Sequence, residues 1–280
     1  MKSAAPMFVL GLRDGILVGI DDVENGLSCG CVCPGCHSPL IARKGGRRAH
    51  HFAHKPGEDC GGGVETSIHM LAKDVLAKSR KIMLPSVTIS LREGGGPWRV
   101  HGPQLVELDD VVLERRTGHI IPDVVCVADG RELFVEIAVT HPVEAAKVST
   151  IREMGVSAIE VNLSNEDRAS SKQHIEAIIV NGTNLKKWLF HSPTAVLERE
   201  LRGKVEALPL TDRGLATHAD NCPLPAREWR GKPYANVMWD CPGCIWSVDM
   251  DSEYQYCAGR HARPSLEKRG MKPEWHYLES

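Results

Sequence analysis

The chain has 280 residues, of which 42% are hydrophobic and 25% charged, the composition of an ordinary globular protein and not of a disordered or fibrous one. Its 34 lysines and arginines against 36 aspartates and glutamates give a formal net charge of -2, which excludes binding of nucleic acid through bulk positive charge. No apolar run reaches the ~18 residues that a membrane helix needs, and the N-terminus has no secretory pattern. We therefore expect a cytoplasmic protein with no membrane partner.

Ten cysteines are the unusual feature of the composition. In a reducing compartment, cysteines bind metal or remain buried thiols more often than they form disulfides. Five lie near the start of the chain, four lie near its end, and Cys126 stands alone in an apolar run, where we expect a buried thiol. This distribution predicts an N-terminal β-hairpin and zinc knuckle (residues 1–62), a core (63–190), a helical linker (191–213) and a C-terminal Cys-rich, zinc-ribbon-like module (214–280).

Hydrophobic periodicity and turn residues predict the elements in chain order. The chain begins with a hairpin whose strands cover 8–12 and 16–20. The core then has a helix over 64–80, strands over 86–92, 104–114, 120–128 and 132–139, a helix from Pro142 to Met154, a strand over 157–163 and a helix over 166–180, and a charged helix over 193–205 follows. The middle of the chain is thus ordered helix, three strands, helix, strand, which predicts an α/β core with a mixed sheet.

The hairpin of residues 120–139 is the most informative local feature. Asp129-Gly130 is favoured in two-residue turns because both positions accept positive φ. With this turn, residue 128 pairs with residue 131, and Asp123 faces Glu136 with Cβ atoms about 5 Å apart. Two buried carboxylates this close repel each other unless a cation lies between them or one of them is protonated, and oxygen ligands favour Mg²⁺ or Mn²⁺ for that cation. A longer turn would instead shift the register and send one acid to solvent.

A third acid lies on the predicted helix over 64–80. Glu65, His69 and Lys73 recur at intervals of four residues and form a polar stripe beside the apolar stripe of this helix. A site at the rim of the core would draw its ligands from such a stripe, so Glu65 is a candidate third acid. The alternative is a solvated helix face, which is the simpler interpretation for Lys73 alone.

This combination resembles the PD-(D/E)xK nuclease superfamily and, more narrowly, the competence protein CoiA-like family. The superfamily motif matches Ile121-Pro122-Asp123 followed by Glu136-Ile137-Ala138. The CoiA-like pattern adds a CPxC and HFxH knuckle and a Glu-Thr/Ser-x-x-His helix, which match Cys33-Pro-Gly-Cys36, His51-Phe-Ala-His54 and Glu65-Thr-Ser-Ile-His69. The resemblance covers about residues 25–165 and implies a restriction-endonuclease-like αβββαβ core, flanked here by the two zinc modules.

The resemblance also implies roles for the acids. Asp123 and Glu136 would hold a catalytic Mg²⁺ or Mn²⁺, and Glu65 would assist through a second metal or a water. The metal would generate a hydroxide that attacks a phosphodiester of DNA. One departure matters, because the motif lysine two residues after the second acid is Ala138 in this chain.

Three other residues are candidates for the role of that lysine. Lys147 lies one to two turns into the following predicted helix, Lys73 lies on the first helix, and His141 lies just beyond the strand that carries Glu136. If none of them acts, the chain is a non-catalytic zinc-containing nucleic-acid-binding or adaptor protein with a degenerate nuclease fold.

The N-terminal cysteines predict a structural zinc site. Cys33 and Cys36 with His51 and His54 supply ligands in two close pairs, the usual arrangement for tetrahedral zinc in a short segment. The resemblance to the HFxH pattern selects His51 over His50. Spare candidates that could displace a histidine are Cys29, Cys31 and Cys60.

A second zinc site is predicted near the C-terminus. Cys222, Cys241, Cys244 and Cys257 provide four thiolates, and Cys241-Pro-Gly-Cys244 forms a knuckle suited to a closed Cys₄ site. His218 or His261 are alternative ligands in place of Cys222 or Cys257.

Five basic residues lie within thirteen positions around the first knuckle, although the chain as a whole is almost neutral. This local patch is the candidate for contact with DNA phosphates, and the alternative is a solvated basic loop. Its residues are Arg43, Lys44, Arg47, Arg48 and Lys55.

Overall fold

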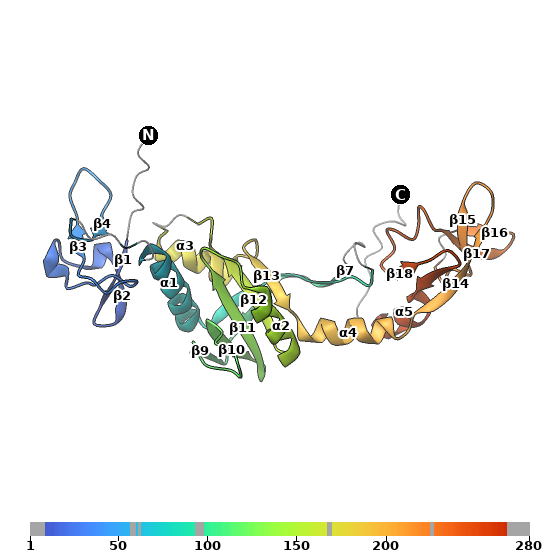
Figure 1. Cartoon of the computed structure of the whole chain (residues 1–280), viewed down its shortest axis with the longest axis horizontal. Helices are drawn as coiled ribbons and strands as arrows, with labels where there is room; N and C mark the ends of the chain where they lie inside the picture. The colour runs from blue at the N-terminus through green and yellow to red at the C-terminus, as the bar shows by residue number, and fades with distance from the viewer. Residues whose placement is uncertain are drawn as a thin grey trace. The chain divides into compact units, whose positions relative to one another are not determined.

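The structure is a computed structural model that describes residues 9–56, 60, 63–92, 98–166, 170–224 and 227–267. It divides into two compact units (Figure 1). The first unit comprises Met1–Pro85 and Gln104–Phe190, and the second comprises Ser86–Pro103 and His191–Ser280. The sequence placed 63–190 in one core, whereas in this division Ser86–Pro103 interrupts that range.

The first unit opens with two small antiparallel ribbons. Strands β1 (Leu10–Arg13) and β2 (Ile16–Gly19) form the predicted hairpin, and Asp14 and Gly15 at its turn both have positive φ. Strands β3 (Ile41–Arg43) and β4 (His51–Ala53) form the second ribbon and place Phe52 in the core. Two short 3-10 turns, η1 (Ile20–Asp22) and η2 (Leu27–Cys29), connect the first ribbon to the cysteines.

A five-stranded mixed sheet forms the centre of the first unit, in the order β13-β12-β11-β10-β9. The bounds are β9 Asp110–Leu113, β10 Val124–Ala128, β11 Arg131–Ala138, β12 Ser157–Asn162 and β13 Lys186–Phe190. Strands β11 and β12 are parallel and the other pairs are antiparallel. Because parallel neighbours need a crossover connection, a helix separates them along the chain, which is α2 (Ala145–Met154).

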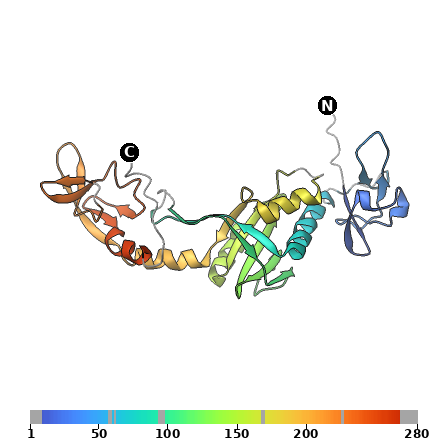
Figure 2. The same ribbon diagram turned by 180° about the vertical axis from the view of Figure 1, so that it is seen from behind.

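Two helices cover opposite faces of this sheet, as Figures 1 and 2 show from opposite sides. Helix α1 (Gly63–Ser79) buries Ile68, Ala72 and Leu76 in one core cluster with the side chains of Val124, Cys126, Leu133, Val135, Ile159 and Val161. Helix α2 buries Ile151 in another cluster with Val125, Phe134 and Ala158. Successive strand residues point to opposite faces, so Glu136, two residues after Phe134, lies on the α2 face.

Smaller elements complete the first unit. Strand β5 (Lys81–Leu84) pairs with β8 (Gln104–Glu107) outside the main sheet, and α3 (Lys172–Glu176) continues into the π-helical turn η3 (Ala177–Asn181). The prediction of one strand over 104–114 is therefore wrong. The chain changes partner between β8 and β9, where the Leu108 N–H donates to Arg80 O and the Asp109 N–H donates to Val127 O.

Two predicted helix starts also differ from the structure. Helix α2 begins at Ala145 and not at Pro142, because Glu144 is extended and the Val143 N–H bonds to the Glu160 carboxylate. In the range 166–180 the helix begins at Lys172, where Ser171 accepts a hydrogen bond from the His174 N–H, and residues 167–169 lie outside those described.

The second unit is built on a six-stranded sheet in the order β16-β17-β15-β14-β19-β18. The bounds are β14 Glu206–Asp212, β15 Thr217–Asp220, β16 Arg227–Trp229, β17 Lys232–Asn236, β18 Ser247–Met250 and β19 Tyr254–Cys257. Helices α4 (Ser192–Arg202) and α5 (Gly259–Glu267) and the ribbon of β6 (Val87–Ile89) and β7 (Trp98–His101) complete it. Trp246 lies at the centre of its core.

Within the described ranges, no helix combines the length and the apolar character that crossing a membrane requires.

Candidate metal centres

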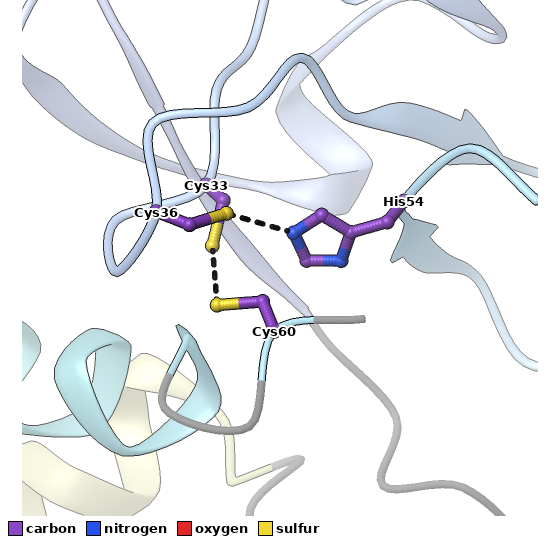
Figure 3. A group of neighbouring side chains, drawn as sticks. All are labelled: Cys33, Cys36, His54 and Cys60. Atoms are coloured by element: carbon purple, nitrogen blue, oxygen red, sulfur yellow. Dashed lines mark hydrogen bonds between the residues drawn. The ribbon is translucent and has the colours of Figure 1, made fainter. Parts of the chain in front are cut away.

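The first candidate centre is a cluster of three thiols and one imidazole in the N-terminal part of the first unit (Figure 3). The ligand atoms of Cys33, Cys36, His54 and Cys60 all lie within 4.8 Å of one another. Cys33 Sγ lies 3.8 Å from Cys60 Sγ, and Cys36 Sγ lies 3.3 Å from His54 Nε2. Among the described residues, this is the only group of three or more such side chains that meets this limit.

The geometry of this cluster fits tetrahedral zinc. Zinc binds sulfur at ~2.3 Å, so two sulfurs on a tetrahedral ion lie ~3.8 Å apart, the separation of Cys33 from Cys60. The chemistry fits as well, because three thiols and one imidazole form a Cys₃His set, which is common in closed structural zinc sites. The cluster can therefore hold a zinc ion, and it would cross-link the chain around β3 and β4 to the residue that leads toward α1.

His51, which the sequence analysis placed in this site, is not part of the cluster, and Cys60 is. His51 begins strand β4, where it pairs with Arg43, and its Nδ1 lies 2.9 Å from the Ala49 carbonyl oxygen. His54 follows the end of the strand and is therefore free of the ladder. Cys60 was a spare candidate in the sequence, and its thiol lies beside that of Cys33.

The two thiols of the knuckle have opposite electrostatic environments. Hydrogen bonds from Ser38 lower the pKa of the Cys36 thiol to about 6, and His54 adds to this effect. Burial raises the pKa of the Cys33 thiol to about 11, although the Gly35 N–H donates to its sulfur at 3.4 Å. In both cases the backbone N–H two residues after the cysteine points at the sulfur.

The second candidate centre lies at one end of the hairpin of β10 and β11. The register is the predicted one: Val124 pairs with Val135 and Ala128 with Arg131, around a turn in which Asp129 and Gly130 have positive φ. Asp123, one residue before β10, therefore stands opposite Glu136. The Ile137 N–H donates to Asp123 Oδ2 at 2.8 Å, which fixes the Asp123 carboxylate beside β11.

Glu136 is almost completely buried, with 2% of its surface exposed. Its Oε2 lies 2.7 Å from Lys147 Nζ, which also donates to the Ile121 carbonyl oxygen at 3.0 Å. Its Oε1 is buried and has no hydrogen-bond partner within the described part of the chain. Burial raises the pKa of Glu136 to about 7, the negative charge of Asp123 contributes, and Lys147 opposes the shift.

Asp123 has the opposite shift. Burial alone would raise its pKa, but the hydrogen bond and charge of His69, whose Nε2 lies 3.0 Å from Asp123 Oδ2, hold the pKa below its usual range. The two facing carboxylates are therefore contacted by basic side chains from two helices, His69 on α1 and Lys147 on α2. One carboxylate stays ionised, and the other gains a proton near neutral pH in the absence of further positive charge.

The remaining predicted residues of this centre lie elsewhere. Glu65 Oε1 accepts a hydrogen bond from Thr140 Oγ1, just beyond β11. Lys73 is buried and pairs with Glu114 at 2.5 Å, and His141 is exposed. Glu65, Asp123 and Glu136 do not form a group whose oxygens lie within 4.8 Å of one another. Of the three candidates to replace the motif lysine, Lys147 is the one that contacts Glu136.

Glu160 is a residue that the sequence analysis missed. Strand β12 places it beside Glu136 in the parallel register, and β13 places Lys187 beside Glu160. The Glu160 side chain is fully buried, accepts a hydrogen bond from the Val143 N–H at 2.9 Å and lies 2.8 Å from Lys187 Nζ. The sequence signal is a single acid within the apolar strand over 157–163, but its alignment with Glu136 depends on the parallel register.

The third predicted centre, formed by the C-terminal cysteines, is less closely gathered. The residues are Cys222, Cys241, Cys244 and Cys257, and no three of their sulfurs lie within 4.8 Å of one another. Three of the four are buried in the core of the second unit, and Cys244 packs against that core. The alternative ligand His218 stacks on Tyr234 with ring centroids 4.0 Å apart, and His261 Nε2 lies 3.8 Å from Glu206.

The basic loop lies between β3 and β4 and just after β4. Arg43, Arg47, Arg48 and Lys55 are exposed. Lys44 differs, because its Nζ donates to the carbonyl oxygens of Asp21 and Val23 at 3.0 and 2.8 Å, so it anchors the loop instead of extending into solvent.

Comparison with known proteins bears on the first centre. Residues 27–62 match the family of the competence protein CoiA, N-terminal domain. This segment contains all four residues of the Cys₃His cluster and the basic loop, so the match supports the CoiA family for this part of the chain. No curated protein and no solved structure matches the chain.

Proposed function

We propose that this chain is a divalent-metal-dependent, nuclease-like protein that acts on DNA. The observation that carries the proposal is the facing pair of Asp123 and Glu136, with the ammonium group of Lys147 2.7 Å from Glu136. Two acids and a lysine at one end of an interior hairpin are the groups that metal-assisted hydrolysis of a phosphodiester needs. The position of the motif lysine is occupied by Ala138 in this chain, and Lys147 on α2 would take the role of that lysine.

The order of elements supports a restriction-endonuclease-like core of the PD-(D/E)xK type. Helix α1, strands β9, β10 and β11, helix α2 and strand β12 occur in the order αβββαβ, with strands β5 to β8, which pair outside the main sheet, between α1 and β9. Strands β9 to β12 are neighbours in one sheet, with helices on opposite faces. The acids stand at the end of β11 and before β10, as the superfamily motif requires.

The residues of this centre fit Mg²⁺ or Mn²⁺. Their donors are carboxylate oxygens, which these hard cations prefer, and Glu136 Oε1 is a buried acceptor without a partner among the described residues. Asp123 and Glu136 would hold the ion, and Glu65 would join through water. The ion would supply Lewis-acid activation of water and of the scissile phosphate.

The chain's own groups would prepare this site for the substrate. His69 keeps Asp123 ionised, Lys147 balances the charge of Glu136, and the surroundings bury Glu136 almost completely while Asp123 stays partly accessible. Lys147 would also offset the negative charge that develops on the phosphate during attack, because such interactions are strong where water is excluded.

We propose that the zinc knuckle presents DNA to this centre. The Cys₃His cluster would hold the ends of the loop that carries Arg43, Arg47 and Arg48, whose guanidinium groups suit phosphate oxygens. The match to the CoiA N-terminal domain supports a competence-related role for the chain. DNA uptake, recombination or processing is then the expected setting.

The proposal is tested by incubating the purified chain with single- and double-stranded DNA in the presence of Mg²⁺ or Mn²⁺. The control is the double variant Asp123→Asn/Glu136→Gln, which keeps the shapes of both side chains. We expect cleavage by the wild-type chain that EDTA abolishes and that the double variant lacks. Equal cleavage by both proteins would refute the assignment of these acids.

The second candidate function is a non-catalytic DNA-binding or adaptor protein, which Ala138 in the motif position favours. It predicts metal-independent binding of DNA without cleavage. Binding would fall in the triple variant Arg43→Ala/Arg47→Ala/Arg48→Ala and would persist in Asp123→Asn/Glu136→Gln. Gel-shift and cleavage assays on the same three proteins distinguish the two functions.

A further inference from the structure

We propose that Cys222, Cys241, Cys244 and Cys257 form a second zinc site that holds the second unit together, independent of the Cys₃His cluster. These four thiols come from three places in the sheet of that unit. Cys222 follows β15, Cys241 and Cys244 lie in the turn between β17 and β18, and Cys257 ends β19. An ion bound by all four would join segments that are distant in the sequence.

The structure already brings these three segments together. The Ala258 N–H donates to Trp246 O at 2.9 Å, which ties the segment after Cys257 to the segment after Cys244. Arg260 donates to Asn221 O at 2.9 Å, which ties the same segment to the residue before Cys222.

Gly259 lies where the segments meet. A Cβ atom added there would lie 2.9 Å from Pro223 Cγ, 3.4 Å from Cys257 Sγ and 3.5 Å from Trp246 Cβ. Only a residue without a side chain fits at this point, which keeps the segments of Cys222, Cys244 and Cys257 in contact.

The backbone around these thiols repeats the pattern of the first knuckle. The Gly259 N–H donates to Cys257 Sγ at 3.4 Å, as the Gly35 N–H does to Cys33 Sγ. Burial raises the pKa of Cys222 and Cys244, and backbone N–H groups of Leu224 and Trp246, which likewise donate to the two sulfurs, oppose that rise. An N–H group two residues after a cysteine stabilises negative charge on its sulfur, which is what a bound thiolate requires.

A buried thiol that binds no cation stays protonated, so it does not need N–H groups that donate to its sulfur. Cys222, Cys241 and Cys257 are buried in one core cluster and Cys244 packs against it, so the four side chains share one core. A divalent cation would draw the four sulfurs from their present separation into one shell. Four thiols form a donor set that selects a soft, tetrahedral ion, which is zinc in a structural site.

The test is the zinc content of the full-length chain, measured by mass spectrometry of the metal after purification without chelator. We expect two zinc ions per chain. The variant Cys241→Ser/Cys244→Ser should hold one, Cys33→Ser/Cys36→Ser should hold one, and the combined variant should hold none. The matched control Cys126→Ala removes a buried thiol outside both groups and should keep two.

Cobalt substitution provides a second measurement that does not depend on the folding of the Cys241→Ser/Cys244→Ser variant. In Cys33→Ser/Cys36→Ser, one bound Co²⁺ should show thiolate charge-transfer absorption and tetrahedral visible bands. A single zinc in the wild-type chain that Cys33→Ser/Cys36→Ser removes completely would overturn the proposal. These readouts do not involve DNA, so they stand whether or not the chain is a nuclease.

Discussion

At the scale of single residues, the ligand of the N-terminal cluster that is most distant in sequence was the hardest to predict. Cys60 lies 27 residues after Cys33, and nothing in the local pattern ranks it above Cys29, Cys31 or the histidines. The local pair Cys33 and Cys36 was predictable because a two-residue spacing forms a knuckle by itself. His54 was also predicted, whereas His51, which pairs with Arg43 in the ladder of β3 and β4, lies outside the cluster.

Substitution of Cys60 tests this ligand set. We expect Cys60→Ser to lower the zinc content of the full-length chain by up to one ion, since serine is a poor zinc ligand. His51→Ala should leave the zinc content unchanged, because the His51 ring faces the Ala49 carbonyl group. Zinc analysis of both variants side by side checks the prediction, and the reverse result would restore the Cys₂His₂ set.

Substitution of Lys147 and of Lys73 provides a second test at the scale of residues. Both lysines were candidates for the role of the motif lysine. Lys147 contacts Glu136, whereas Lys73 is held by Glu114. We expect Lys147→Met to lower the rate of DNA cleavage by about 10²-fold, the effect of removing one group that stabilises charge in a transition state. Lys73→Met should lower it much less. Initial cleavage rates with Mn²⁺ measure both, and a larger loss in Lys73→Met would move the role to α1.

At the scale of elements, the antiparallel hairpin was predictable and the parallel pair was not. The turn Asp129-Gly130 sets the register of β10 and β11 and lies only a few residues from the acids, so the position of Asp123 opposite Glu136 follows from the sequence. The register of β12 beside β11 depends on where α2 begins and ends and on how it packs. For this reason Glu160 was missed, although it lies beside Glu136.

Glu160 fixes the start of α2 through the Val143 N–H, and the length of its side chain matters for that contact. Glu160→Gln keeps an oxygen at the same reach, whereas Glu160→Asp keeps the charge but is one methylene shorter. We expect Glu160→Asp to lower the free energy of unfolding by about 1–3 kcal/mol more than Glu160→Gln does, because a buried donor loses its acceptor. Denaturant unfolding compares them, and a smaller loss in Glu160→Asp would assign the effect to charge.

Lys186 connects three elements and gives stability a dependence on pH. Its ammonium group is buried and donates to Met83 O of β5 and to Ile179 O of η3 at 2.9 and 2.5 Å. Burial lowers its pKa to about 8, below the 10.5 of an exposed lysine. Between these values the unfolded chain binds more protons than the folded chain, so this lysine makes stability rise with pH, by at most about 1.4 kcal/mol per pH unit.

The measurement is the difference in the free energy of unfolding between the wild-type chain and Lys186→Met. Taking this difference cancels the contribution of the other titrating groups, which both proteins share. We expect a constant difference below pH 8 and a difference that rises in favour of the wild-type chain from pH 8 to pH 10. A difference that falls over this range would mean that the folded chain holds the proton more tightly than the unfolded one.

At the scale of the whole molecule, the net charge is close to zero, although basic and acidic side chains are concentrated in different parts of the chain. The formal charge of -2 is a total over the whole chain. Within it, basic residues are concentrated in the loop near residues 43–55, and an acidic pair lies at the end of a buried hairpin. The sequence revealed both because each is local. It did not reveal that Ser86–Pro103 belongs to the second unit, because that depends on the packing of Ile89 and Leu91 in one core cluster with α4, which is distant in the sequence.

The acidic pair also connects metal binding to the stability of the whole chain. An ion that binds the folded chain and not the unfolded one raises the free energy of unfolding by about 2.7 kcal/mol at a concentration 100 times its Kd. We expect Mn²⁺ to raise the melting temperature of the zinc-loaded wild-type chain and to leave Asp123→Asn/Glu136→Gln unchanged. The substitution at Glu136 also changes the stability of the metal-free protein. The quantity to compare is therefore the change in melting temperature that Mn²⁺ causes within each protein. Equal shifts in both proteins would place the Mn²⁺ site elsewhere, whereas a shift confined to the wild-type chain would establish a cation site at these acids even if DNA is never cut.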